Sequence, residues 1–372
     1  MNKEISHFLQ ERIDAGDFPS AVYLVAENGK IVFHDALGYA VVEPELIRAK
    51  PDTIYDIASL TKPLATGLII TRLVESGKLD PNEPIGNLLN EFYSSLNANI
   101  TVNQLMMHTS GLPDWRPFYL LVDTPDDVPQ SIANTLPLDQ EPVKYSDLNF
   151  LTLGFIAERV TDLPFETITD AIFSALGLGD TYFNPEPGLR PRIAASEKGN
   201  EYEKNTCVEL GYLTERSDSL AQTFLRDYQI WGEVHDGNAW FMGGVGGHAG
   251  LFSTAEDVFK IALQFLPNYT TLLKPETTEL FHRNFTEGMN EGRSFAFQLA
   301  STEGSTAGTL MSPQSFGHNG FTGTSMWIDP AKDRIFVLLT NRIHAHPLPF
   351  VNINSVRRRF HDLAVEALDK NR

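Results

Sequence analysis

The sequence predicts an α+β fold, in which an antiparallel β-sheet is flanked by the N- and C-terminal helices and carries a large inserted all-helical region. Residues typical of β-strands gather near both ends of the 372-residue chain, in residues 20–40 and again in residues 322–341. From residue 59 to about residue 285, apolar residues recur mainly at helical spacing. We therefore expect strands from both ends to form one sheet.

The first 40 residues predict a helix followed by a hairpin. Ile5, Leu9 and Ile13 have the spacing of one face of an amphipathic helix. Two segments rich in Val, Tyr, Ile and Phe then flank the Asn-Gly dipeptide at 28–29, which is typical of two-residue hairpin turns. The fold is thus expected to begin with one helix and two antiparallel strands.

The rest of the chain predicts helices first and strands later. Thr101 and Gln104 resemble the capping box that opens a helix. The expected helices are residues 59–78, 101–108, 146–162, 253–266 and 354–370, and the expected strands are 294–300, 322–329 and 333–341. These segments predict a sheet domain of residues 1–58 together with 290–372, and a mostly helical domain of residues 59–289.

Composition narrows the choice of partners. The chain has 29 Lys and Arg against 48 Asp and Glu, a net charge of −19, so its surface repels phosphate backbones and anionic headgroups. We expect neither a nucleic-acid nor a membrane partner. The single cysteine, Cys207, excludes an intrachain disulfide. With no signal-peptide pattern at the start, a cytoplasmic location is expected. The oligomeric state is left open.

The segment "SLTK" raises the first question of function. A helix that begins at Ser59 places Lys62 one turn away on the same face, close enough to interact. Pro63 fits this register, because its missing N–H falls among first-turn donors that have no acceptor within the helix. Taken alone, however, the pattern favours a plain N-cap serine followed by a solvated lysine.

Further motifs reverse that preference. Tyr145 stands in "KYSDLN", and His318-Asn319-Gly320 opens "HNGFTGTSMWID". In order and spacing, the three motifs resemble the S-x-x-K, Y-x-N and K-T-G elements of the serine beta-lactamase and penicillin-binding-protein superfamily, in its class C beta-lactamase and esterase branch. The segments "HTSGL" and "GGVGGHAGLFSTAEDV" extend this resemblance, which covers roughly residues 5–365.

The resemblance implies a serine hydrolase whose active site lies in the cleft between the two domains. Ser59 would be the nucleophile that forms an acyl-enzyme, and Lys62 and Tyr145 would handle its proton, with the choice of general base left open. The backbone N–H groups of Ser59 and Phe321 would form the oxyanion hole. Gly320 fits a strand that approaches the substrate closely. This chemistry requires no cofactor and no metal.

Histidines elsewhere in the chain raise the question of a metal site. Without a clustered ligand spacing, structural roles are expected for His108, His235 and His248. A contact with substrate is the alternative for His235 and its neighbour Asp236, and for His248.

Two departures from the family pattern guide the choice of substrate. Asp147 stands where asparagine is usual, and His318 replaces the lysine of K-T-G, which weakens the expected grip on a substrate carboxylate. We assign Asp147, His318, Gly320 and Phe321 to substrate binding. The favoured activity is an esterase on small acyl esters. The alternatives are a D-alanyl-D-alanine carboxypeptidase, a D-aminopeptidase or a beta-lactamase, and then a catalytically silent ligand-binding protein.

Overall fold

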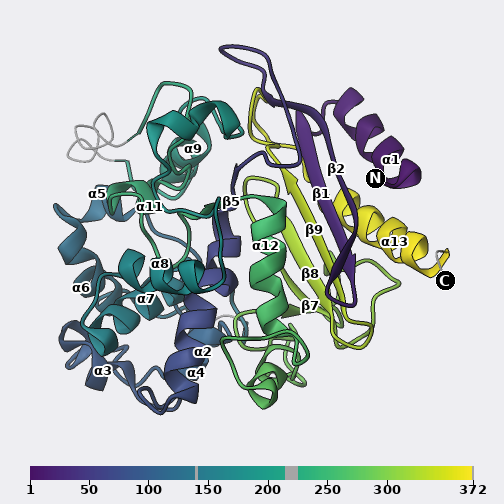
Figure 1. The fold of residues 1–372 in the computed structure, drawn as a ribbon. Coiled ribbons are helices and arrows are strands. Elements are labelled where there is room, and N and C mark those ends of the chain that lie inside the picture. The colour runs from purple at the N-terminus through teal and green to yellow at the C-terminus, as the bar shows by residue number, and fades with distance from the viewer. Residues whose placement is uncertain (139–140, 214–224, 371–372) are drawn as a thin grey trace.

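The computed structural model describes residues 1–138, 141–213 and 225–370, and within them the main feature is a seven-stranded antiparallel sheet (Figure 1). Its strand order is β3-β2-β1-β9-β8-β7-β6. The strands are β1 Ser20–Glu27, β2 Lys30–Val41, β3 Ile47–Arg48, β6 Gln298–Leu299, β7 Phe316–Asn319, β8 Ser325–Asp329 and β9 Arg334–Thr340. A separate two-stranded ribbon joins β4 Tyr55–Asp56 to β5 Phe252–Ser253.

The pairing of β1 with β9 joins the two ends of the chain. Val22 of β1 lies opposite Leu339 of β9 in an antiparallel register. The predicted hairpin also forms, because Asn28 and Gly29 both adopt the positive φ angles, 52° and 69°, that a tight two-residue turn between β1 and β2 requires. The expectation that both ends build one sheet is confirmed.

The sheet is buried on both faces, and β9 shows how one strand serves two apolar layers. Ile335, Val337 and Leu339 face the larger core, which is shared with the helical region. Phe336 and Leu338 alternate with them and face a smaller core against the first and last helices. In Figure 1, α1 and α13 cover one side of the sheet, while α12 and the other helices lie on the opposite side.

Most of the described helices lie between β4 and β6. Helix α7 contacts α2, α3, α4, α6 and α8, and α12 packs on β1 and β9. The helices are α1 Lys3–Asp14, α2 Leu68–Glu75, α3 Ile85–Leu88, α4 Val102–Met106, α5 Phe118–Leu121, α6 Val128–Ala133, α7 Asp147–Thr161, α8 Phe165–Ala175, α9 Glu201–Glu209, α11 Gly237–Phe241, α12 Ala255–Ala262 and α13 Asn354–Lys370. In the described ranges, no helix has both the length and the apolar character needed to cross a bilayer.

One local prediction about a helix cap is confirmed, and one about a strand is wrong in length. The capping box of Thr101 and Gln104 opens α4 as expected. The strand expected over 294–300 was wrong in length, since only Gln298–Leu299 pair. The reason is Ala296, whose φ of 66° lies in the left-handed region and interrupts the extended backbone. The division into domains 1–58 with 290–372 and 59–289 stays a prediction.

We predict that Leu338→Ala lowers the free energy of unfolding by about 2–5 kcal/mol, because it leaves a cavity in the smaller core where Leu338 is fully buried. Urea denaturation of the variant beside the wild type measures this change. Ile31→Ala, at an exposed position of β2, is the control and should change the free energy by less than about 0.5 kcal/mol. Equal effects of the two substitutions would contradict the assignment of Leu338 to the core.

Candidate active site

Ser59 lies in a tight turn that follows β4. Residues Ala58–Leu60 form a 3-10 turn, and Lys62–Gly67 form a π-helical segment that runs into α2. The expected regular helix from Ser59 was therefore wrong in type, although Pro63 does occupy its first turn. Ala58 has a positive φ of 47°, and its N–H donates to Asp56 Oδ1 at 2.8 Å. This left-handed residue sets the direction in which the chain leaves β4 at Ser59.

The Lys62 ammonium is fully buried and has three polar contacts. Its Nζ donates to Ser59 Oγ at 2.9 Å and to the backbone oxygen of His248 at 3.0 Å. It also lies 2.7 Å from Oδ1 of Asp147. Burial alone would lower the pKa of Lys62, but the Asp147 carboxylate and the Tyr145 phenol outweigh it and leave the pKa above its ordinary value. Lys62 is therefore an ammonium at neutral pH.

Tyr145 lies beside this ammonium. Lys62 Nζ is 5.1 Å from the centre of the Tyr145 ring. Burial raises the pKa of the phenol and Lys62 lowers it, and the net effect is a pKa above its ordinary value, so Tyr145 is neutral at pH 7. The short loop that carries Tyr145 is held by His108, whose backbone oxygen and Nδ1 accept from Lys144 N–H and Ser146 N–H at 2.9 and 3.1 Å. His108 thus has a clear structural task.

The third motif packs on the turn that carries Ser59. Thr322 Oγ1 donates to the Asp56 backbone oxygen at 2.7 Å, and Thr324 Oγ1 donates to that of Ile57 at 3.0 Å. The expected strand position of Gly320 was wrong, since it follows β7 in the turn toward β8. A Cβ on Gly320 would lie 2.6 Å from the Ile57 oxygen and would also meet Thr324, so protein packing alone requires glycine here.

His318, at the end of β7, is neutral. Its Nδ1 lies 2.8 Å from the Asn319 backbone oxygen, and since a carbonyl only accepts, Nδ1 carries the proton. Burial, with Lys62 and Arg293 nearby, holds the pKa of His318 well below its ordinary value. Its Nε2 is buried and has no partner among the described residues. His318 therefore offers a free acceptor in place of the family's lysine donor.

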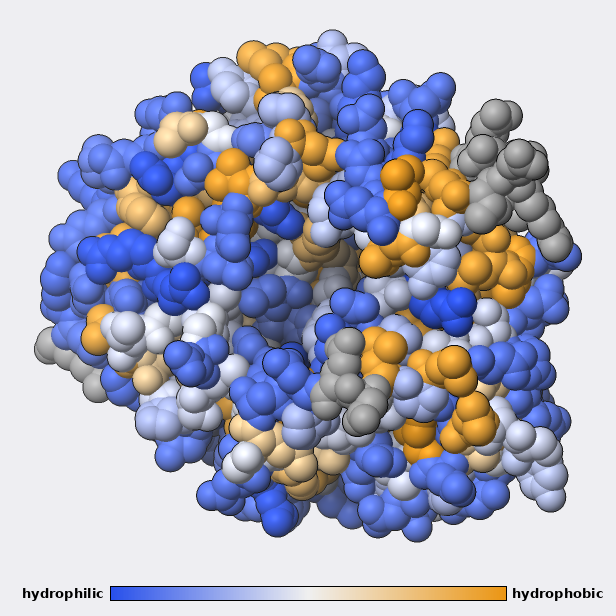
Figure 2. Space-filling view, turned by 180° about the vertical axis from the view of Figure 1, so that it is seen from behind, coloured by the Kyte–Doolittle hydropathy of each residue, from blue (hydrophilic) through white to orange (hydrophobic). Residues whose placement is uncertain are grey.

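A pocket of about 580 Å³ joins these groups. The face seen in Figure 2 is hollowed near its centre. All seven predicted site residues except Lys62 line the pocket, and Lys62 lies buried behind Ser59. The backbone N–H groups of Ser59 and Phe321 have no protein acceptor in the described structure. The lining includes Ser59, Tyr145, Asp147, His318, Gly320, Phe321, Trp115, Tyr202, Glu203, His235, Asp236, Arg342, Asn354 and Arg357.

Two arginines in the lining, the buried Arg357 and the partly buried Arg342, were missed by the sequence reasoning. Arg357 donates to the backbone oxygens of Gly320 and Thr324, and Arg342 donates to that of Phe321. Neither forms an ion pair with a carboxylate of the described residues. Burial lowers the pKa of both, that of Arg357 to about 9. A signal for Arg357 did exist, because it lies at helical spacing with Phe360 and Ala364 on the apolar face of α13.

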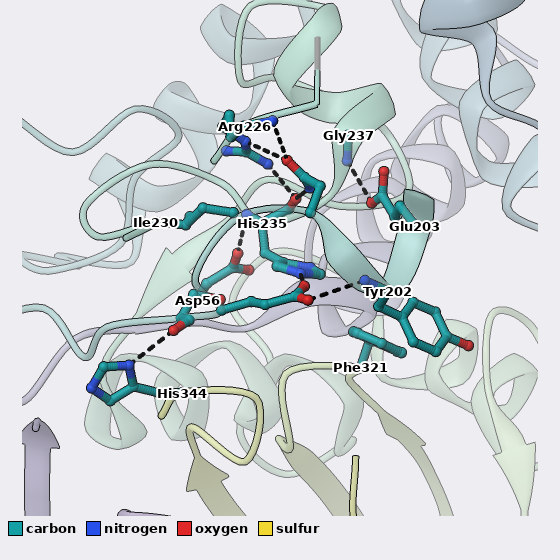
Figure 3. A network of polar contacts seen from close by, with 12 residues as sticks. Asp56, Tyr202, Glu203, Arg226, Ile230, His235, Gly237, Phe321 and His344 are labelled. Carbon is teal, nitrogen blue, oxygen red and sulfur yellow. Dashed lines mark hydrogen bonds and ion pairs between the residues drawn. The ribbon is translucent and has the colours of Figure 1, made fainter. Parts of the chain in front are cut away.

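An acidic network forms the wall on the other side of Phe321. Figure 3 shows His235 at its centre, with Nε2 2.6 Å from Glu197 and its backbone N–H on Asp56 at 2.8 Å. The His235 ring stacks on Phe321 with ring centres 5.6 Å apart. His235 and Asp236 both line the pocket, and a contact of either residue with substrate stays a prediction. His248 is fully buried and contributes its backbone oxygen to Lys62.

One group in this region has the composition of a metal site. Ligand atoms of Asp147, Asp236 and His248 lie within 4.8 Å of one another. Asp147 already binds the Lys62 ammonium, however, and His248 Nε2 lies 3.0 Å from Asp236. A second cation beside Lys62 would be repelled, so the geometry favours an ion-pair network over a metal centre.

Comparisons with known proteins agree with this geometry. The family model described as "Beta-lactamase" matches residues 5–356. A protein of Escherichia coli K12 named "Putative D-alanyl-D-alanine carboxypeptidase" is 32% identical over 374 residues, which cover 92% of this chain and 82% of that protein. A Salmonella gallinarum protein of the same name is 33% identical and covers 91% and 82%.

Solved structures show the same fold. A class C beta-lactamase from Rhodobacter sphaeroides superposes with a TM-score of 0.73 at 18% identity, covering 99% of this chain and all of the other. EstCE1, "a hydrolase with promiscuous acyltransferase activity", has a TM-score of 0.71 at 21% identity, covering 98% and 97%. The predicted fold class and the resemblance are confirmed. This chain belongs to the beta-lactamase family and is a serine hydrolase.

Proposed function

We propose that this serine hydrolase is a carboxypeptidase for peptides that end in a D-amino acid, such as D-alanyl-D-alanine. The observation that carries the proposal is a pair of arginines, the partly buried Arg342 and the buried Arg357, which line the pocket of the nucleophile and have no carboxylate partner among the described residues. A free C-terminal carboxylate on the leaving group would supply the missing anion. The names of the Escherichia coli and Salmonella relatives support the same class of enzyme, a D-alanyl-D-alanine carboxypeptidase.

In the proposed mechanism, Ser59 attacks the scissile carbonyl and is acylated. Lys62 acts as the general base after releasing its own proton to solvent, and it becomes an ammonium when it takes the Ser59 proton. The N–H groups of Ser59 and Phe321, together with this new ammonium, stabilise the oxyanion, and the proton then passes by way of Tyr145 to the departing amine. Water then attacks the acyl-enzyme along the same path and releases the free acid.

An esterase on small acyl esters is the second candidate. The neutral His318 favours it, because this histidine lacks the fixed charge of the lysine that it replaces. Both candidates use the same nucleophile and differ in the leaving group. A D-aminopeptidase differs from the first candidate in requiring a free amine on the acyl part of the peptide. A beta-lactamase and a silent ligand-binding protein rank below these candidates, and the cytoplasmic location stays a prediction.

We predict that Ser59→Ala lowers both the hydrolysis of p-nitrophenyl butyrate and the release of D-alanine from acetyl-D-alanyl-D-alanine by at least about 10³-fold, as loss of a nucleophile does in acyl-transfer enzymes. Initial rates on the purified proteins, with thermal melting to establish folding, measure this. Ser76→Ala, at the end of α2, is the matched control and should keep wild-type rates. A folded Ser59→Ala protein with retained turnover would remove Ser59 from the mechanism.

The pH dependence of kcat/KM should report the pKa of Lys62. Asp147→Asn removes the carboxylate that holds the pKa of Lys62 above its ordinary value, and burial then lowers that pKa. Because the neutral lysine is the base, the rise of kcat/KM with pH should begin at lower pH in the variant than in the wild type. Profiles between pH 6 and 10 measure the shift. Coincident profiles would show that Lys62 is not the base.

Selective loss of peptide activity should follow from Arg357→Gln. Removing a charge that binds the leaving-group carboxylate is expected to lower kcat/KM for acetyl-D-alanyl-D-alanine at least about 10-fold more than kcat/KM for p-nitrophenyl butyrate. Arg359→Gln, at an exposed position of the same helix, is the control. An equal loss on both substrates would assign Arg357 to structure and favour the esterase.

A further inference from the structure

The wall formed by α9 and α11 carries a carboxylate without a cationic partner in the described structure. Glu203 is only 7% exposed and lines the pocket of Ser59. Its Oε1 accepts from Gly237 N–H at 2.8 Å, and its Oε2 accepts from Tyr119 O–H at 2.9 Å. Both donors are neutral. His235, which lies beside Glu203 in Figure 3, is already bound to Glu197.

The Glu203 carboxylate has only neutral hydrogen-bond donors around it and would be stabilised by a cation. Burial and the nearby Asp236 raise the pKa of Glu203 to about 7, so a cation in the pocket would stabilise its ionised form. Each carboxylate oxygen has two acceptor positions, and the protein fills one on each oxygen. The remaining positions are available to a ligand that brings hydrogen-bond donors.

A second, independent acceptor lines the same pocket. His318 is 5% exposed, and its unprotonated Nε2 has no partner among the described residues. Burying a hydrogen-bond acceptor without a donor costs free energy unless a ligand or a water molecule donates to it. The pocket therefore has a buried acceptor at His318 and a buried carboxylate at Glu203, and both call for donor groups on the bound molecule.

We propose that Glu203 binds a free ammonium group on the acyl part of the substrate, so that the preferred substrates are unblocked D-amino-acid esters and peptides. The inference rests on the proposed function in taking Ser59 as the nucleophile. Arg342 follows β9 and Arg357 lies on α13, whereas Glu203 lies on α9. The two positive charges and the carboxylate therefore come from different elements. A small peptide with a free amine and a free carboxylate would satisfy both.

The test compares pairs that differ only in the charge of the amine. The first pair is D-alanine methyl ester and its N-acetyl derivative, and the second is D-alanyl-D-alanine and its N-acetyl derivative. We expect the wild type to prefer the free amine by at least about 10-fold in kcat/KM, mainly through KM. In Glu203→Gln, this preference should fall to about 1.

Glu201→Gln, an exposed position in the first turn of α9, is the matched control and should keep the wild-type preference. Equal turnover of both esters by the wild type would overturn the proposal, as would failure to turn over either ester. A preference that survives in a folded Glu203→Gln protein would also overturn it. If the esters are discriminated while the dipeptides are inert, the carboxypeptidase function fails and the role of Glu203 stands.

Discussion

The active site depends on the buried ammonium of Lys62. A cation removed from water is stable only where other groups replace its hydration, and here Asp147, Ser59 Oγ and the His248 backbone oxygen do so within 3.0 Å. These groups come from α7, the turn after β4 and the glycine-rich loop before β5. The charge therefore fixes three distant segments of the chain around one atom, and any shift among them would leave it uncompensated.

The packing of the glycine-rich loop follows from the same requirement. Gly247 lies against Gly154 of α7, and a Cβ on either residue would press on the other's backbone. Thr66 Oγ1, from the π-helical segment, also donates to the Gly247 backbone oxygen. The loop can approach α7 this closely only because both positions lack side chains. That approach delivers the neighbouring His248 oxygen to Lys62.

Sequence patterns predicted the fold and the three motifs well, since these depend on local signals. The apolar run of β9, the dipeptide at 28–29 and the capping box at Thr101 each report a structure formed within a few residues. Arg342, Arg357 and Glu203 escaped notice because their importance lies in what surrounds them. Whether a charged side chain is buried, and what it then contacts, is decided by segments outside its own element, such as Tyr119 beside Glu203 and Gly320 beside Arg357, and no single-sequence pattern records that.

Asp147 and His318, the two departures from the family motifs, both replace a hydrogen-bond donor with an acceptor. Asparagine both donates and accepts, while the carboxylate of Asp147 only accepts, and the lysine of K-T-G donates, while His318 presents a bare Nε2. Each change removes a donor beside the nucleophile and leaves an acceptor. Arg342, Arg357 and the buried Arg293, which is paired with Glu291, place positive charge in the lining of the pocket. In the function that we propose, Arg342 and Arg357 bind the substrate carboxylate, and the acceptors beside Ser59 favour a substrate group that donates.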